Sequence, residues 1–341
     1  MTSEETQQID GIPNLEWLTL VEEDALDPAL PICDPHHHLW DQPDYRYLFE
    51  ELLADLDCGH NIVSTVYVDC ASMYRANAPA HLAPVGETEF VNGVAAMSAS
   101  GRYGRTRVAA GIVGFADLLI GTDVDEVLAT HRSASQRFRG IRQSTNWDAS
   151  PDVDFYEAPA PGMLSEPKFR KGFARLAHHD LSFDAWLYHP QIPELIELAH
   201  AFPETHIILN HLGTPLGVGP YAGREREVFV EWKTLIAKLS ECPNVTAKLG
   251  GLVMPINGFG FHQDDRPPTS EALAAATRQY YLHAIDCFGV DRCMFESNFP
   301  EEKVSCSYGV LWNAFKRITE HFSSSEKAAL FHDTAVRIYR L

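Results

Sequence analysis

The stretch CDPHHHLWD, Cys33–Asp41, carries the chain from an apolar run at residues 30–32 into a row of three histidines. Successive side chains of an extended strand point to opposite sides of it. His36 and His38 are therefore predicted to share one face, while His37 takes the other. Two imidazoles on one face form a pair of metal ligands or proton carriers. A surface histidine cluster is the alternative interpretation, although this row is short, internal and framed by apolar residues.

Around this stretch, short β-rich runs alternate with longer helical patterns as far as the last residues of the chain. The predicted strands are Pro31–Asp34, Val63–Asp69, Val108–Phe115, Phe138–Gln143, Ser182–Tyr188, His206–Asn210, Val245–Leu249 and Cys293–Ser297. The predicted helices are Tyr47–Asp57, Glu87–Ala99, Asp123–Ser135, Glu166–His179, Gln191–Ala201, Glu225–Glu241, Ser270–Phe288, Tyr308–Glu320 and Ser325–Tyr339.

Eight strand–helix repeats with near-continuous apolar strands indicate an α/β protein with a parallel sheet covered by helices. Eight is also the number that closes a (β/α)₈ TIM barrel. A doubly wound open sheet is the alternative, but no G-x-G-x-x-G follows the first strand, which argues against a dinucleotide site. We expect residues 1–29 to form an N-terminal arm and residues 30–341 to form the single barrel domain.

Composition narrows the classes of partner. The 341 residues carry a formal net charge of −20, which argues against nucleic acid and anionic membranes as partners. A site for an anionic substrate would have to gather its own basic residues. The start of the chain has no signal peptide, no stretch is apolar enough to span a membrane, and the seven cysteines contain no C-x-x-C pair. These features predict a cytoplasmic protein with free thiols.

Reactive residues collect where the predicted strands end, which is where barrels of this kind place their chemistry. Histidines stand at three of the eight ends, and one of these positions is double. The residues at the strand ends are His36, His38, Asp69, Cys70, Arg139, Arg142, His189, His211, Lys248, Glu296 and Asn298.

Several motifs together resemble the amidohydrolase superfamily. They are DPHHHLW at 34–40, WLYHPQ at 186–191, LNHLGTP at 209–215, AKLGGL at 247–252, MFESNFP at 294–300 and the terminal ALFHDTAVRIY. The chain is most similar to the amidohydrolase-related branch, which contains sugar-lactone and pyrone-dicarboxylate lactonases and aromatic-acid decarboxylases. The resemblance covers about residue 31 to the end of the chain.

This resemblance implies a ligand set for a metal. His36 and His38 match the H-x-H pair that holds a metal in metal-dependent members, and His189 matches a strand-five metal ligand. His211 matches a histidine that contacts the metal or the substrate carbonyl. One divalent metal is therefore implied, with zinc as the expected ion, although a metal-independent mechanism stays open.

The chain departs from the family where the strand-eight aspartate, the usual general base, is replaced by Asn298. An amide does not accept a proton at neutral pH, so Asn298 can only orient water or substrate. Glu296 lies two residues earlier on the same strand and is predicted to point the same way, as a replacement base. The alternative for Glu296 is a structural ion pair with Lys248 or an arginine. His211, or a metal-bound hydroxide on His36, His38 and His189, are other routes to the base.

Basic residues of the site are expected to hold an anionic group. The FRGIRQ stretch resembles the family's strand-four motif, in which arginines bind substrate carboxylates. Arg142 falls at the strand end, whereas Arg139 sits earlier and is a candidate for a structural role. Lys248 is expected near the substrate or in an ion pair. Further expected lining residues are Asp69, Cys70, Tyr74, Arg75 and Trp147, beneath the long loops at 148–161 and 257–269.

We therefore expect a hydrolase that opens a lactone or related cyclic ester by water attack on the carbonyl. Its partner is expected to be a small anionic substrate. A non-oxidative decarboxylase and a non-catalytic ligand-binding barrel are the alternatives. The sequence is silent on oligomeric state, although members of this family often form homodimers.

Overall fold

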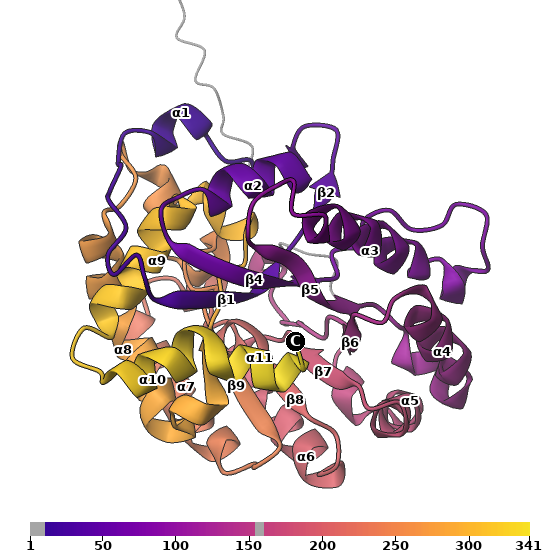
Figure 1. Ribbon diagram of the computed structural model, residues 1–341. Helices are drawn as coiled ribbons and strands as arrows, with labels where there is room; N and C mark the ends of the chain where they lie inside the picture. The colour runs from indigo at the N-terminus through magenta and orange to yellow at the C-terminus, as the bar shows by residue number, and fades with distance from the viewer. Residues whose placement is uncertain (1–10, 154–159) are drawn as a thin grey trace, which may run out of the picture.

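The computed structural model describes residues 11–153 and 160–341, in which eight parallel strands form one sheet in sequence order. The strands are β1 (Pro31–His37), β4 (Asn61–Val68), β5 (Arg107–Gly114), β6 (Phe138–Arg142), β7 (Ser182–Ala185), β8 (Ile207–Leu209), β9 (Val245–Leu249) and β10 (Cys293–Phe295). The predicted α/β barrel is confirmed, and the doubly wound alternative is wrong because neighbours in sequence are neighbours in the sheet (Figure 1).

The two ends of the sheet meet just beyond β10. His38 N donates to Phe299 O at 2.8 Å, and Asn298 N donates to His36 O at 2.9 Å. A parallel bridge between His37 and Phe299 continues this contact. The histidine stretch is thus both the first strand and the seam at which the barrel closes.

Helices cover the outside of the barrel, one after each strand as predicted. They are α2 (Phe49–Leu56), α3 (Val85–Ala99), α4 (Val124–Ala134), α5 (Pro167–His178), α6 (Ile192–Ala201), α7 (Glu225–Ser240), α8 (Ser270–Phe288) and α9 (Tyr308–Ile318). The predicted last helix is divided into α10 (Ser324–Ala328), a π-helical turn (Ala329–Asp333) and α11 (Thr334–Tyr339). Its start is a capping box between Ser323 and Glu326.

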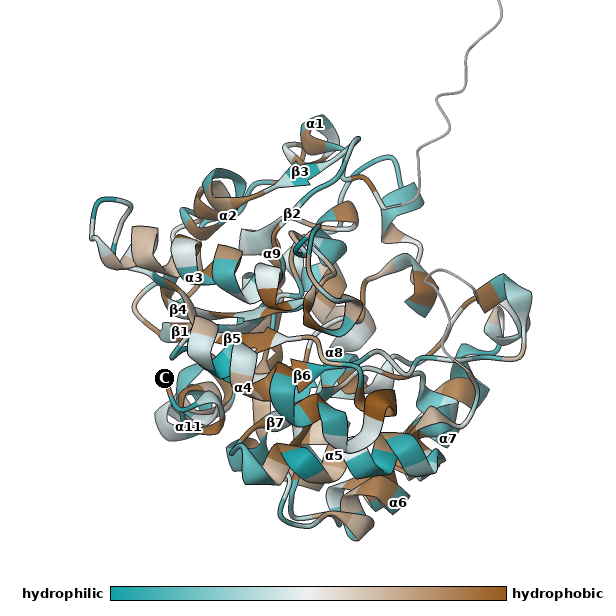
Figure 2. Ribbon diagram, turned by 90° about the vertical axis from the view of Figure 1, so that its right-hand side faces the viewer, coloured by the Kyte–Doolittle hydropathy of each residue, from teal (hydrophilic) through white to brown (hydrophobic). Residues whose placement is uncertain are grey.

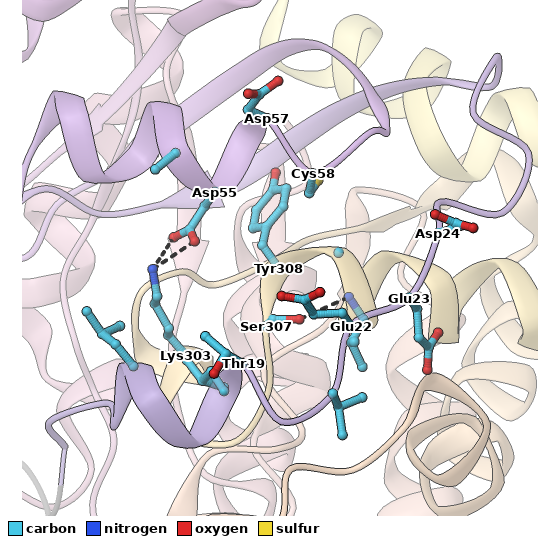
Figure 3. Close-up of a pocket in the computed structure, with 16 residues that line it drawn as sticks. Thr19, Glu22, Glu23, Asp24, Asp55, Asp57, Cys58, Lys303, Ser307 and Tyr308 are labelled. Atoms are coloured by element: carbon cyan, nitrogen blue, oxygen red, sulfur yellow. Dashed lines mark hydrogen bonds and ion pairs between the residues drawn. The ribbon is translucent and has the colours of Figure 1, made fainter.

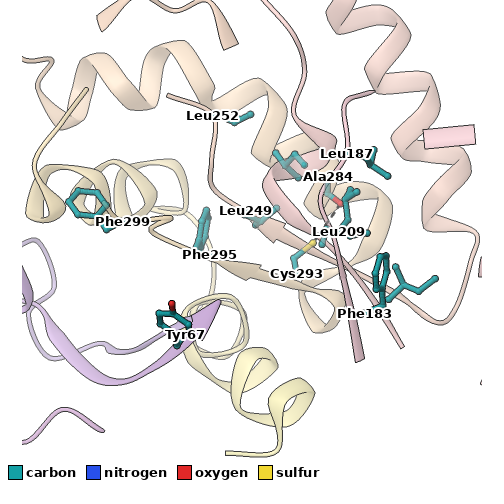
Figure 4. Close-up of a cluster of buried hydrophobic side chains, with 14 of the residues drawn as sticks. Tyr67, Phe183, Leu187, Leu209, Leu249, Leu252, Ala284, Cys293, Phe295 and Phe299 are labelled. Carbon is teal, nitrogen blue, oxygen red and sulfur yellow. Dashed lines mark hydrogen bonds between the residues drawn. The ribbon is translucent and has the colours of Figure 1, made fainter. Parts of the chain in front are cut away.

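Apolar side chains pack in two layers. The larger one lies between strands and helices, as Figure 4 shows for Phe183, Leu209, Phe295 and neighbouring residues. Correspondingly, α5 and α7 carry hydrophilic residues on the faces that point away from the barrel (Figure 2). A smaller cluster fills the barrel interior and includes residues of α11, which closes the amino-terminal end of the barrel. Its buried members are Cys33, Val66, Val68, Val113, Ile208, Met294, Ala335, Ile338 and Tyr339.

Two short elements have no counterpart in the predictions. A hairpin of β2 (Trp40–Asp41) and β3 (Arg46–Tyr47) follows the histidines, and α1 (Leu15–Leu18) lies in the expected arm. Both are too short to give a periodic signal. The arm is anchored where Leu26 N donates to Asn313 Oδ1 at 2.8 Å. Of the long loop at 148–161, residues 154–159 lie outside the described residues, as do residues 1–10 of the arm.

All seven cysteines are free thiols, as predicted. None of the helices in the described ranges is long and apolar enough to cross a membrane.

A matched pair of glycine substitutions tests the packing of helices on the barrel. A Cβ on Gly172 of α5 would clash with the carbonyl oxygen of Leu118 and lie 2.9 Å from its Cα, whereas a Cβ on Gly93 of α3 would meet nothing within 4 Å. Gly172→Ala is expected to destabilise the fold by about 1–3 kcal/mol through overpacking. Gly93→Ala is expected to stabilise it by about 0.5–1 kcal/mol through helix propensity. Urea unfolding measures both, and equal shifts of the same sign would contradict this packing.

Candidate active site

The site begins with a bulge in β1, which resets the strand register between Asp34 and His37. Beyond the bulge, His36 and His38 point into the barrel mouth, with their Nε2 atoms 3.2 Å apart. His37 points the other way, where its Nε2 lies 2.9 Å from Thr65 Oγ1. The alternation predicted from the sequence therefore holds.

Hydrogen bonds assign the protons of the histidine pair. His38 Nδ1 lies 2.8 Å from Val68 O, which can only accept, so this Nδ1 carries the proton. His36 Nε2 lies 3.4 Å from Arg142 Nη1, which can only donate, so the proton of His36 is placed on Nδ1. That Nδ1 lies 2.6 Å from Glu296 Oε2 and 3.2 Å from Lys248 Nζ. Burial holds the pKa of both imidazoles well below the usual value. Two neutral rings thus turn their Nε2 lone pairs toward each other.

Glu296 is the centre of this arrangement and is completely buried. One of its oxygens contacts His36, and the other accepts from His211 Nδ1 at 2.8 Å and from His211 N at 3.1 Å. Burial would raise the pKa of this carboxyl, but His211 and Lys248 outweigh that effect and lower it. Glu296 is therefore a carboxylate shared between two imidazoles.

His36, His211 and Glu296 also form a candidate metal site, because one ligand atom from each lies within 4.8 Å of the others. His211 Nδ1 already donates to Glu296, and the protonated His36 Nδ1 lies 2.6 Å from the other carboxylate oxygen. A protonated nitrogen has no lone pair to offer a metal. The Nε2 atoms of His36 and His38 are free of that conflict. We therefore favour the Nε2 atoms as the metal-facing donors.

Lys248 has no exposed surface, so it lies inside the barrel and below the level of a residue that binds substrate. Its Nζ is 2.9 Å from Asp184 Oδ1 and 3.8 Å from Glu296 Oε2. Tyr339 of α11 donates to the same Asp184 oxygen at 2.7 Å, and its ring centroid lies 5.4 Å from Lys248 Nζ. Of the two roles expected for Lys248, the geometry matches the ion-pair partner.

Arg142 is the basic residue that reaches the histidines. Its Nη1 lies 3.4 Å from His36 Nε2, and its Nη2 donates to Asp69 O. The guanidinium carbon stands 5.6 Å from the ring centroid of Trp186, whose ring in turn packs edge-on to His211. Arg139 is not in this cluster, because it is the second residue of β6, whereas Arg142 is the last.

Asn298 occupies the family's base position with an unusual backbone, φ 54°. Its Nδ2 donates to Met254 Sδ at 3.4 Å, and within the described part of the chain its buried Oδ1 has no hydrogen-bond partner. His189 is also buried, with its ring edge-on to Tyr221. Its Nδ1 accepts from Leu216 N at 3.3 Å, and burial lowers its pKa to about 4. His189 does not belong to the candidate metal group of His36, His211 and Glu296.

Other expected lining residues turn outward from the barrel. Tyr74 OH donates to Asp69 Oδ1 at 3.1 Å, and Arg75 pairs with the exposed Glu89. Cys70 N donates to the buried Glu87 at 3.0 Å. Trp147 is half-buried, and its backbone N–H donates to Gln191. The period of a strand explains the position of Asp69, which follows the inward-facing Val68 by one residue.

A large cavity lies away from this cluster. It measures about 810 Å³ and lies between the arm, α2 and α9, where acidic residues surround the Lys303–Asp55 ion pair (Figure 3). None of the clustered site residues lines it. Tyr308 on its wall connects indirectly to the site, because its OH donates to Asp34, which also accepts from Ser297.

Three comparisons place the chain among known proteins. Residues 33–341 match the family described as Amidohydrolase. An uncharacterised protein, y4mH, of Sinorhizobium fredii is 37% identical over 334 residues, covering 92% of this chain and 99% of the relative. An L-fucono-1,5-lactonase of Burkholderia ambifaria is 26% identical over 242 residues, 70% of this chain and 72% of that protein.

Among solved structures, an amidohydrolase from Burkholderia multivorans with bound zinc superimposes with a TM-score of 0.70 at 23% identity, over 91% of this chain and 99% of that one. This likeness supports the barrel fold, and the family match extends over nearly all of it. The chain belongs to the amidohydrolase family and is a hydrolase of that superfamily.

Proposed function

We propose that this enzyme hydrolyses a lactone, or a related cyclic ester, that carries an anionic group. The observation that carries the proposal is the grouping at the barrel mouth of two imidazoles on one carboxylate, with a third imidazole, His38, and the Arg142 guanidinium beside His36. Hydrolysis of a cyclic ester needs a polarised carbonyl, a base for water and a hold on the substrate. Each of these has a candidate here.

The residues present fit a divalent metal. The Nε2 atoms of His36 and His38 are unprotonated and 3.2 Å apart, and one cation can contact both because zinc–nitrogen bonds are about 2.0–2.1 Å. Val68 O and Glu296 orient the two rings from behind, as second-shell partners of metal-binding histidines do. A metal held there would supply Lewis-acid polarisation of the substrate carbonyl. Zinc remains the expected ion.

His211 is our candidate for the general base. Its Nδ1 donates to Glu296, which leaves Nε2 as the atom that accepts a proton from water. The water oxygen then bonds to the carbonyl carbon, the ring carbon–oxygen bond breaks, and the proton passes to the departing ring oxygen. Glu296 fixes the tautomer and stabilises the imidazolium, as the aspartate does in an Asp–His pair. Glu296 thus acts through His211 rather than as the base itself.

Arg142 is the candidate anchor for the anionic group of the substrate. Its guanidinium is held in place by Asp69 O and lies beside the Trp186 ring, at hydrogen-bonding distance from the histidine pair. Arginine forks match carboxylates in geometry. The similarity to proteins named L-fucono-1,5-lactonase supports a lactone as the substrate class.

Replacing both His36 and His38 with alanine tests the metal-facing pair. Turnover of a lactone substrate is expected to fall to background, and elemental analysis of purified wild-type protein is expected to find about one metal per chain that the double variant lacks. Circular dichroism checks that the barrel remains folded. Wild-type turnover in the folded double variant would contradict the assignment.

Glu296→Gln tests the carboxylate behind His211. An amide cannot accept both Nδ1 protons, so kcat is expected to fall by at least about 100-fold with a smaller change in KM. Glu302→Gln is the matched control: Glu302 is equally buried, burial raises the pKa of its carboxyl, and its contact from Val253 N suits an amide oxygen equally well. A loss below threefold in Glu296→Gln, or equal losses in both variants, would remove Glu296 from this role.

A further inference from the structure

Arg139 belongs to the same FRGIRQ stretch as Arg142 but lies at the opposite end of β6, away from the histidines. It lines a cavity of about 290 Å³ at the amino-terminal face of the barrel. The turns before β6 and β7 and the residue after α11 form its walls, and Figure 1 shows the last residues of the chain beside β7 on the side of α4 and α5. The lining residues are Arg132, Ser135, Gln136, Phe138, Arg139, His179, Asp180, Leu181 and Arg340.

Three guanidinium groups meet at this cavity, and their hydrogen bonds go to uncharged carbonyl oxygens. Arg132 donates to His179 O at 3.2 Å, and Arg139 donates to Gln136 O at 2.6 Å. Arg340 donates to Asp180 O at 2.8 Å. These bonds hold the arginines in place without neutralising their charge.

Carboxylates do little to balance these charges. Among the described residues, the one ion pair made by the three arginines joins Arg340 to Asp180 at 3.8 Å, and the Asp180 side chain is 83% exposed. Burial and the neighbouring charges of Arg340 and Arg137 lower the pKa of Arg139. Mutual repulsion of this kind is unfavourable unless an anion relieves it, and the rest of this protein is strongly acidic, with a net charge of −20.

We propose that the cavity binds a phosphate dianion, either inorganic phosphate or the phosphate group of a small phosphomonoester. Three arginines carry enough positive charge for a dianion, and their planar forks match phosphate oxygens. The volume lies at the lower end of the range for small-molecule sites, about 300–1,000 Å³, which excludes large ligands. The site is separate from the histidine cluster and does not depend on the proposed reaction.

Isothermal titration calorimetry with inorganic phosphate tests the proposal, in a chloride buffer of constant ionic strength. One phosphate per chain is expected, with a Kd below about 1 mM. Arg340→Gln and Arg132→Gln are each expected to weaken binding at least about 10-fold, since each removes a charged donor. Both residues are exposed, and circular dichroism checks that each variant is folded. Glycerol 1-phosphate in a second titration distinguishes a phosphomonoester from the free ion by its greater affinity.

A control variant separates this cavity from other basic positions. Arg224→Gln removes an exposed arginine that pairs with Glu227, and it is expected to bind phosphate as the wild type does. Arg142→Gln, which removes the arginine at the far end of the same strand, tells whether phosphate binds at the histidine cluster instead. Absence of binding up to about 10 mM phosphate would overturn the proposal. So would binding that Arg142→Gln abolishes, or that Arg340→Gln and Arg132→Gln leave unchanged.

Discussion

The buried carboxylate of Glu296 is the constraint on which the rest of the site depends. A carboxylate with no exposed surface is stable in a protein only when charged partners and hydrogen bonds compensate for the lost water. Here His36, His211 and Lys248 provide that compensation from three other strand ends. Because one group satisfies both imidazoles, the positions of His36 and His211 are coupled, and so are their tautomers.

The same carboxylate belongs to a chain of contacts that runs down the barrel axis. Lys248 links Glu296 to Asp184, and Tyr339 reaches Asp184 from the helix that closes the opposite end. The carboxylates of Glu296 and Asp184 and the ammonium of Lys248 together carry one net negative charge. The guanidinium of Arg142, next to His36, offsets it. The terminal helix therefore completes the polar interior of the barrel as well as its apolar base.

Sequence reasoning predicted the fold and the clustering well, because both follow from patterns that repeat along the chain. Eight strand–helix units predict a barrel, and strand alternation predicts that His36 and His38 meet. Partners supplied by distant segments carry no such pattern. The contacts of Asp184 and Tyr339 with Lys248 could not be predicted from the sequence. Asp184 does lie on a predicted strand, and the alternation of side chains along that strand indicates that it faces the barrel interior. Trp186, within the WLYHPQ motif, also went unselected.

Asp69 points outward from the barrel and accepts a hydrogen bond from Tyr74 there. This orientation was not predicted, because residues at the end of β4 were assigned to the site without applying the alternation of side chains along a strand. The two arginines of FRGIRQ show the complementary case. Their spacing places them on one strand, but only the structure shows that Arg142 reaches the histidines while Arg139 faces a separate basic cavity. The sequence assigned Arg142 to the site and left Arg139 with a structural role, and it gave no sign of the second cavity.

The central claim is that water attacks the carbonyl of a cyclic ester at this site. Turnover of sugar lactones and carboxylated lactones in ¹⁸O-labelled water, followed by mass spectrometry, tests it most directly. The account predicts one ¹⁸O atom in the new carboxylate of the hydroxy acid, with one proton released and no CO₂. Release of CO₂ from an aromatic or unsaturated acid, with no lactone opened, would contradict it.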